Sequence, residues 1–490
     1  MTHDDRLLSR TADLANDYLA SLAGRPVGRP VDLVALREAL GGPLPEGPTD
    51  PEAVVEGLAV AADAGLVGSA GPRYFGFVVG GSLPAALGAD WLASAWDQNA
   101  GLYALSPAAA VAEEVAAAWL VELLGLPAGT SVGFVTGATM ANFTALAAAR
   151  NSVLARVGWD VERHGLQGAP PVTVITHGGT HVTVYASLQM LGLGREGERV
   201  RKVASDDQGR MRPDALRDAL ADIDGPVIVS TQAGNVNTGG FDPFDRLIPI
   251  AHERGAWVHI DGAFGIWAAA VPSLRPLMRG HDAADSWSTD AHKWLNVPYD
   301  SGLVFVRDAA AHHAAMTLGA EYYVETTGGE RDNYNWTPES SRRARGFAVL
   351  AALRSLGRSG LVELIERDCA HARRMAELLS AGRGVAVLND VVLNQALVRF
   401  EALGSDPDGS AGDTRTRAVI EAVQRDGTCW LGGTTWAGHA AVRISVSGWQ
   451  TTDDDIERSA AAILRCAAAV DAAAADAGRQ GSSDSPGRAG

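Results

Sequence analysis

The sequence is very poor in lysine. It has 41 Lys and Arg residues, and only Lys202 and Lys293 are lysines. Such a bias usually reflects genome composition, so most basic positions accept arginine. A position that remains lysine can require an amine that loses its proton, which arginine cannot supply because its pKa lies above about 12. Chance survival is the alternative for either residue, and Lys202 lies in a charged turn.

Cysteine is also scarce. Cys369, Cys429 and Cys466 are far apart and odd in number. They match neither a disulfide framework nor a zinc-binding pattern. This scarcity favours a reducing, cytoplasmic compartment, and we expect no metal site.

Long apolar runs are missing as well. No run reaches the roughly 18 residues expected of a membrane-spanning helix. The alanine-rich stretches near 105–125 and 459–477 contain acidic or basic residues and predict amphipathic helices. The N-terminal sequence MTHDDRLLSRTADL has acids where a signal peptide is basic. We therefore expect neither secretion nor a membrane anchor.

Positive charge is too sparse for nucleic acid. The formal net charge is -17. Neutralising phosphates requires clustered Lys and Arg, and docking on anionic membranes requires the same. These considerations leave a small molecule as the expected partner.

The order of the predicted elements indicates an α/β fold. From about residue 130, short runs such as VGFVT, PVTVIT, VIVST and WVHID alternate with helical stretches. This alternation predicts a mostly parallel sheet covered by helices on both faces. We expect four parts: an N-terminal helical arm at 1–85, a large domain at 86–365, a smaller α+β domain at 366–477 and a disordered tail at 478–490.

Candidate ligand-binding motifs fall at the carboxyl ends of the predicted strands, where such sheets bind ligands. TGATMAN, residues 136–142, turns a strand into a helix through small residues. Such a turn lets N–H groups at a helix N-terminus approach a phosphate. The motif lacks the signatures of a P-loop and of a dinucleotide site. On its own, it is more often simply a turn.

A second motif, HGGTH, places His181 at the start of a helix. Its two glycines argue against His177 and His181 acting as a helical pair of metal ligands. An imidazole here could stack on a planar ring, or it could be a buried, hydrogen-bonded histidine. Taken alone, the second interpretation is the commoner.

The third and fourth motifs contain an acid and a lysine. Asp261 ends the apolar strand WVHID, where a carboxylate needs a partner such as a protonated ring nitrogen, or caps the next turn. Lys293 follows His292 in a segment rich in Trp and Ser, where apolar surroundings would lower the amine pKa and favour imine formation. A lysine reaching out from a core helix is the alternative. Together the four motifs supply the parts that an enzyme needs to use pyridoxal phosphate (PLP).

The motifs resemble the group II PLP-dependent decarboxylases of fold type I, the family of aromatic-amino-acid, glutamate, histidine and diaminobutyrate decarboxylases. The likeness extends from about residue 50 to 475. It is carried by PRYFGFVVGG, ADWLASAWDQN, TGATMANFTALAAAR, GNVNTGGFDPF, WVHIDGAFG and DAHKW. It implies an enzyme that uses PLP to decarboxylate an L-amino acid to the amine and CO2. It also implies a homodimer with active sites at the interface, because the family's N-terminal segment clamps the partner subunit.

The resemblance further implies residue roles. Lys293 would hold PLP as an imine, Asp261 would pair with the pyridine nitrogen, and His181 would stack over the ring and assist proton transfer. A loop tyrosine of the other subunit would return a proton to the substrate, and Tyr323 is the best match, with Tyr322 beside it. The remaining implied contacts are Gly137, Ala138, Thr139, Ala263 and His292 for the cofactor, and Phe75 and Asn99 for the substrate.

Some positions depart from the family pattern. Met140 stands where many members have Glu, and Asp290 stands where many have an Asn that contacts the phosphate. A carboxylate would repel a phosphate dianion, so we expect Asp290 to cap or bond the backbone. Arg443 either binds a substrate carboxylate or forms a structural ion pair.

The departures leave the substrate open, and two other interpretations remain. The same scaffold supports transamination, aldol-type cleavage and oxidative deamination, because geometry decides which bond breaks. A non-catalytic homologue acting as a binding protein is the alternative of another class, against which the presence of both Asp261 and Lys293 argues.

Overall fold

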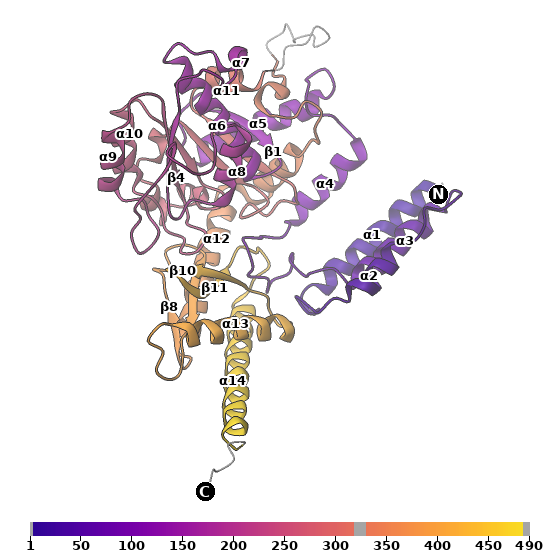
Figure 1. Cartoon of the computed structure of the whole chain (residues 1–490). Coiled ribbons are helices and arrows are strands. Elements are labelled where there is room, and N and C mark those ends of the chain that lie inside the picture. The colour runs from indigo at the N-terminus through magenta and orange to yellow at the C-terminus, as the bar shows by residue number, and fades with distance from the viewer. Residues whose placement is uncertain (1–2, 318–329, 484–490) are drawn as a thin grey trace.

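The structure, a computed structural model, describes residues 3–317 and 330–483 (Figure 1). Tyr322 and Tyr323 lie outside the described residues. None of the described helices combines the length and the apolarity needed to cross a membrane.

A seven-stranded sheet forms the centre of the larger body, in the order β1-β7-β6-β5-β4-β2-β3. Its strands are β1 (Ser131–Val135), β2 (Thr173–His177), β3 (Val200–Val203), β4 (Val227–Gln232), β5 (Trp257–Asp261), β6 (Ser286–Asp290) and β7 (Gly302–Val306). Neighbouring strands are parallel, except that β7 runs antiparallel to β1 and β6. The expected mostly parallel sheet is therefore confirmed.

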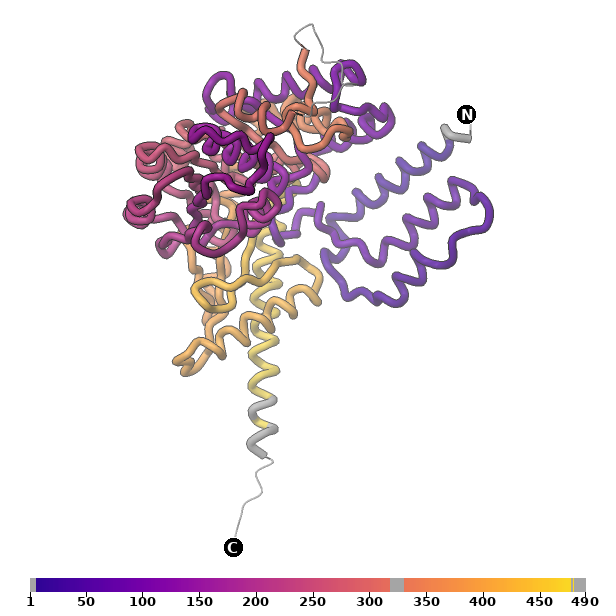
Figure 2. The backbone as a smooth tube through the Cα atoms, turned by 45° about the horizontal axis from the view of Figure 1, so that its top comes forward, coloured from indigo at the N-terminus to yellow at the C-terminus, as the bar shows by residue number. Residues whose placement is uncertain are grey.

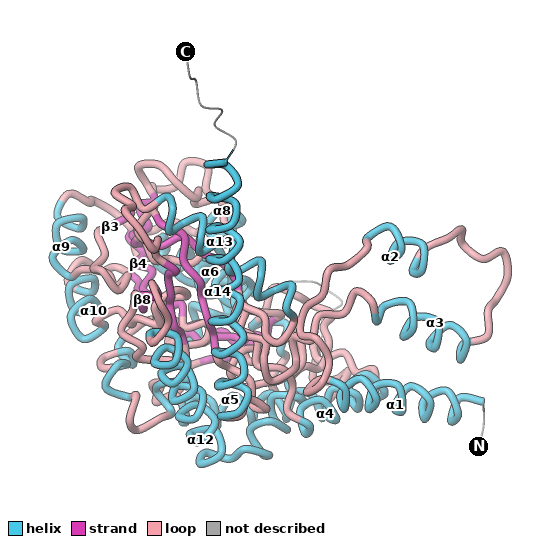
Figure 3. Tube along the Cα trace, turned by 90° about the horizontal axis from the view of Figure 1, so that it is seen from below, coloured by secondary structure: helices cyan, strands magenta, loops and turns pink. Residues whose placement is uncertain are grey.

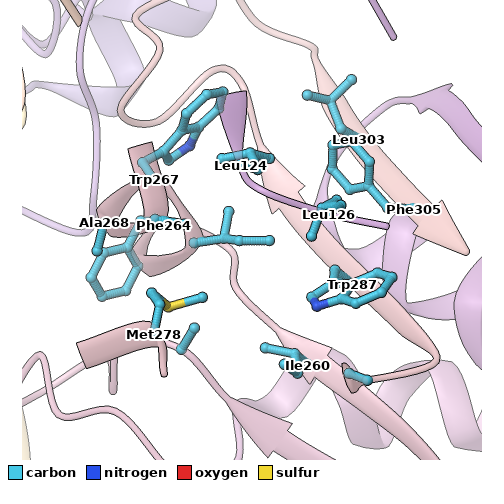
Figure 4. Close-up of a cluster of buried hydrophobic side chains, with 14 of the residues drawn as sticks. Leu124, Leu126, Ile260, Phe264, Trp267, Ala268, Met278, Trp287, Leu303 and Phe305 are labelled. Atoms are coloured by element: carbon cyan, nitrogen blue, oxygen red, sulfur yellow. The ribbon is translucent and has the colours of Figure 1, made fainter. Parts of the chain in front are cut away.

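Helices cover both faces of this sheet, because alternate residues of its strands point to opposite sides. On β7, Leu303 and Phe305 belong to one apolar cluster and Val304 to the other. Figure 4 shows part of the first cluster, in which Trp287 lies near Ile260. The flanking helices are α5 (Pro107–Leu123), α6 (Ala138–Ala155), α7 (Val161–His164), α8 (Val182–Met190), α9 (Pro213–Ala221), α10 (Phe244–His252) and α11 (Ala309–Met316).

Helix α12 (Gly346–Ser380) leads from this body to a smaller one and is interrupted at Gly357, whose φ is 60°. The boundary that we predicted after residue 365 falls inside this helix. The smaller body contains an antiparallel sheet in the order β10-β11-β9-β8. Its strands are β8 (Val385–Val387), β9 (Gln395–Phe400), β10 (Gly432–Trp436) and β11 (His439–Ser445). The expected small α+β unit is thus present.

Two helices complete the smaller body, α13 (Ser410–Asp426) and α14 (Asp453–Ser483). The end of α14 corrects one expectation. Residues 478–483, which we predicted to be disordered with the tail, continue the helix as far as Ser483.

The N-terminal segment forms an arm that stands away from the rest of the chain (Figures 1, 2 and 3). It consists of α1 (His3–Ser21), α2 (Leu33–Leu40) and α3 (Pro51–Asp63), and α4 (Pro84–Trp96) follows on the main body. Neither α2 nor α3 contains a buried residue. The segment is helical and lacks its own core, as we expected.

Candidate active site

A cavity of about 360 Å³ opens where strands β4, β5 and β6 end and helices α6 and α8 begin. Eight predicted site residues line it together. These are Gly137, Ala138, Thr139, His181, Asp261, Ala263, His292 and Lys293. Residues far apart in the sequence thus meet at the carboxyl edge of the sheet, where doubly wound folds bind ligands.

The start of helix α6 forms one wall of the cavity. Gly137 precedes the helix in an extended conformation, and a Cβ there would lie 3.2 Å from His292 Cε1. Gly302 on β7 packs so closely that its own Cβ would lie 2.4 Å from Gly137 Cα. Small residues therefore let β7 and His292 approach the helix N-terminus, whose first N–H groups have no partner within the helix.

Asp290 uses both carboxylate oxygens at this wall. Oδ1 accepts a hydrogen bond from the Ala138 N–H at 2.5 Å. Oδ2 lies 2.8 Å from the amine of Lys293. The expectation that Asp290 bonds the backbone is confirmed, and the Ala138 N–H that we predicted for the phosphate already has a partner.

The neighbours of His292 fix which of its two ring nitrogens carries the proton. Its Nδ1 accepts from the Ser301 N–H at 3.1 Å, so the ring proton is on Nε2, which lies 3.4 Å from Asp290 Oδ1. Tyr299 packs on the ring with the two centroids 4.3 Å apart. Burial lowers the pKa of His292, so the ring is neutral at neutral pH and can donate from Nε2.

Asp261 forms the floor of the cavity at the end of β5. Its Oδ1 accepts from the Ala263 N–H at 3.1 Å, and its Oδ2 accepts from Asn142 Nδ2 at 3.3 Å. Behind them, His259 Nε2 lies 2.9 Å from Asn142 Oδ1. The sequence analysis did not single out Asn142 or His259. Residues two apart on a strand point to the same face, so the position of Asp261 would have indicated His259 as a site residue.

His181 is the N-cap of α8. Its Nδ1 accepts from the Thr183 N–H at 3.3 Å and lies 2.8 Å from Thr183 Oγ1. Burial lowers the pKa of His181, although the nearby Asp261 opposes this effect. The cap fixes Nδ1 and leaves Nε2 as the nitrogen that can serve a ligand.

Arg443 lies at the edge of the cavity. Its Nη1 donates to the backbone oxygen of Val236, a cavity residue, at 3.3 Å. Within residues 3–317 and 330–483 it forms no ion pair. The structural ion pair that we considered is therefore absent from the described part of the chain. Tyr74 stacks on Trp430 and interacts electrostatically with the Arg443 guanidinium.

The two predicted substrate residues do not line the cavity. Phe75 is buried in the apolar cluster of the smaller body. Asn99 accepts from the N–H groups of Gly101 and Arg342 at 2.9 and 3.3 Å. Their roles stay predictions, as does that of Tyr323.

These groups fit PLP. The carboxylate of Asp261 suits a protonated ring nitrogen, and the Lys293 amine suits the aldehyde. The first turn of α6 and His292 Nε2 can hold a phosphate. Ala263, which is small, leaves room for a flat ring at the floor of the cavity.

Comparison with known proteins agrees with this fit. Residues 36–402 match the pyridoxal-dependent decarboxylase conserved domain. The chain is 26% identical over 461 residues to tryptophan decarboxylase 1 of Oryza sativa subsp. japonica, covering 90% of this chain and 88% of the relative. It is 29% identical over 380 residues to L-2,4-diaminobutyrate decarboxylase of Rhizobium meliloti, covering 76% and 73%.

Solved structures show the same fold. The structure of Oryza sativa TDC with PLP and tryptamine superposes with a TM-score of 0.89 at 23% identity, covering 96% of this chain and 98% of that one. The mostly parallel sheet with a smaller second sheet is thus fold type I. With a family match over most of its length, the chain belongs to the pyridoxal-dependent decarboxylases and is a PLP-dependent carboxy-lyase acting on an amino acid.

Proposed function

We propose that Lys293 is the residue that carries PLP and exchanges it with the substrate amine during decarboxylation of an L-amino acid. The observation that carries this proposal is that Lys293 and Asp261 line one cavity, together with His181 and the first residues of helix α6. When bound, PLP supplies an electron sink for the bond that breaks at the substrate Cα.

The side chains around the cavity have distinct tasks in this proposal. Asp261 keeps a proton on the ring nitrogen, because a buried carboxylate stabilises a positive partner. His181 lies opposite, with Nε2 free to hold or donate a proton. His292 and the first turn of α6 bind the phosphate, and Asp290 holds the free Lys293 amine close to its place of reaction.

Arg443 provides the binding site for a substrate carboxylate. A half-buried guanidinium without an ion-pair partner in the described chain offers a strong, directional site for such a group. The two acids in the cavity wall, Asp261 and Asp290, already have partners. A cationic substrate side chain would therefore find an arginine and no free carboxylate, so we propose an acidic or neutral side chain.

A homodimer accounts for the exposed apolar surface of the arm. Its helices expose Leu8, Leu33, Val34, Val54, Leu58 and Val60 by 51–77%. A groove of about 890 Å³ lies between α1 and α3. Helix α4 adds Trp91, Leu92 and Trp96, each 42–49% exposed. So much exposed apolar surface is typical of an interface, and a second copy that supplies the same surface would cover both regions.

The three cysteines are buried and unpaired, which supports a cytoplasmic location.

The test compares the two lysines. Lys293→Ala should abolish release of CO2 and amine and abolish the visible absorbance of the imine with PLP. Lys202→Ala is the matched control, because Lys202 packs on the ring of Tyr185 away from the cavity. Retained absorbance and turnover in Lys293→Ala would refute the proposal. Identification of the product as amine or aldehyde distinguishes simple from oxidative decarboxylation.

A further inference from the structure

A buried chain of hydrogen bonds runs from the sheet to the floor of the cavity. Its centre is Asn142, whose side chain is completely buried. The amide oxygen of Asn142 accepts from His259 Nε2 at 2.9 Å and from Ser288 Oγ at 2.6 Å. The amide nitrogen donates to Asp261 Oδ2 and to Thr183 Oγ1, both at 3.3 Å. Asn142 therefore uses its two donors and its two acceptor positions.

The direction of each hydrogen bond follows from Asp261. An ionised carboxylate only accepts, so the amide nitrogen of Asn142 must face Asp261 and its oxygen must face His259. His259 then donates from Nε2. Trp257 Nε1 donates to Ser286 Oγ at 2.9 Å, which leaves the Ser286 proton for His259 Nδ1 at 3.0 Å. Burial lowers the pKa of His259 to about 4, so the ring carries a single proton, on Nε2.

The Asn142 amide nitrogen thus starts two branches of the hydrogen-bond chain. One leads to Asp261, and the other leads through Thr183 to His181. Because Thr183 Oγ1 accepts from Asn142, its own proton is available for His181 Nδ1, 2.8 Å away. The Thr183 N–H donates to the same nitrogen at 3.3 Å. His181 Nδ1 is thus an acceptor, and the ring proton lies on Nε2, the nitrogen that the helix cap leaves free.

We propose that Asn142 is a positioning residue that couples the two sides of the cavity: one amide orients the Asp261 carboxylate and, by directing the Thr183 hydroxyl proton to His181 Nδ1, reinforces the tautomer that the helix cap favours. This inference rests on the roles proposed above for Asp261 and His181. Its physical basis is that an amide has one donor end and one acceptor end. Removing the Asn142 amide, or turning it around, therefore disturbs the hydrogen bonds to Asp261 and to Thr183 together.

Three variants separate the two branches. Asn142→Ala removes both, and Thr183→Val removes only the hydroxyl that links Asn142 to His181, with little change in side-chain shape. Ser230→Ala is the matched control. Ser230 pairs with His259 in the sheet and is equally buried, but its hydroxyl has no hydrogen-bond partner among the described residues.

Two measurements report on the branches. The first is 15N NMR of the full-length chain with labelled histidine, recorded without PLP. It distinguishes a ring proton on Nδ1 from one on Nε2, and loss of a signal in His181→Gln assigns that residue among the 12 histidines. The second is the dissociation constant for PLP, from titration of the absorbance, which reports on Asp261.

We expect Asn142→Ala to mix the His181 tautomers and to weaken PLP binding at least about tenfold, the scale at which a misplaced group costs binding or rate. Thr183→Val should alter the His181 signals and leave PLP affinity within about threefold. Ser230→Ala should change neither measurement.

Unchanged His181 signals and unchanged PLP affinity in Asn142→Ala would overturn the inference. If that variant does not fold, Thr183→Val decides, because unaltered His181 signals there exclude the coupling. The NMR signals are recorded without PLP, so their outcome is independent of whether Lys293→Ala supports the proposed function.

Discussion

Asp290 links Lys293 to the start of helix α6: one carboxylate oxygen lies 2.8 Å from Lys293 Nζ, and the other accepts a hydrogen bond from the N–H of Ala138. Many members of the family that the chain resembles have an asparagine at this position, whereas this chain has Asp290. The carboxylate holds the Lys293 amine by a close polar contact, and it would repel a phosphate dianion placed at the start of α6.

Asp290→Asn should therefore tighten PLP binding. The amide keeps the side-chain shape and removes the repulsion, and we expect a dissociation constant lower by roughly tenfold, which corresponds to about 1.4 kcal/mol. Absorbance titration of the chain freed of PLP measures it. Asp290→Ala is the control, because it removes the charge together with the hydrogen bond to the Ala138 N–H. Weaker PLP binding in Asp290→Asn would show that the attraction between Asp290 and the Lys293 amine matters more than the repulsion of the phosphate.

His181 should be neutral over the physiological pH range. Burial lowers its pKa below the ordinary value of about 6.5, so the neutral form persists as the pH falls through that value and is lost only in more acidic solution. The acidic limb of kcat against pH should therefore lie below about pH 6.5. His181→Gln should remove this limb and reduce kcat by about 10²- to 10⁴-fold. An acidic limb that survives in His181→Gln belongs to another group.

Arg443→Met should raise KM and leave kcat within a few fold. An ion pair to a substrate carboxylate exists before the reaction as well as during it, so its loss weakens binding of both states. Arg443→Lys keeps the charge without the planar fork and should restore part of the affinity. An effect on every substrate indicates the α-carboxylate. An effect confined to acidic amino acids indicates their side chain.

The arm should hold two copies of the chain together. Leu58→Asp combined with Val60→Asp places two charges on the surface of α3, where these side chains are 59% and 77% exposed. Sedimentation velocity at micromolar concentration should show a monomer with native helix content. Val157→Asp, at a 48% exposed valine on the main body, should leave the dimer intact. A wild-type chain that sediments as a monomer would exclude the proposed homodimer.

Asp368 should make the stability depend on pH. It is completely buried, forms no ion pair with any residue that the structure describes, and accepts a hydrogen bond from Trp294 Nε1 at 2.8 Å. Burial raises its pKa well above the ordinary value, so its stabilising contribution is complete in acid and is lost as the pH rises above about 4. Asp368→Asn should therefore raise Tm more at pH 8 than at pH 5. Equal shifts at both pH values would show that Asp368 is ionised in the fold.

The sequence predicted the alternating elements but missed strand β6. Its sequence, SWSTD, is polar at every position except Trp287, so it did not resemble a buried strand. The strand is nevertheless central and fully buried, because its hydroxyls find partners across the sheet. Ser286 accepts from Trp257, and Ser288 donates to Asn142. Such compensation depends on residues far away in the chain, which a local pattern cannot contain.

The sequence alone identified which residues could carry the chemistry. Lys293 and Asp261 were distinguishable because an amine and a strand-end acid are unusual in those positions, whereas the role of His181 was implied only by the family resemblance. Only the tertiary structure could decide how they are held. The hydrogen bonds of Asn142 and Thr183, and the lack of an ion pair to Arg443 within the described residues, depend on how segments separated by dozens to hundreds of residues meet. Hydrogen-bond direction and charge pairing are set by distances of a few ångströms in space, and the order of residues along the chain does not contain them.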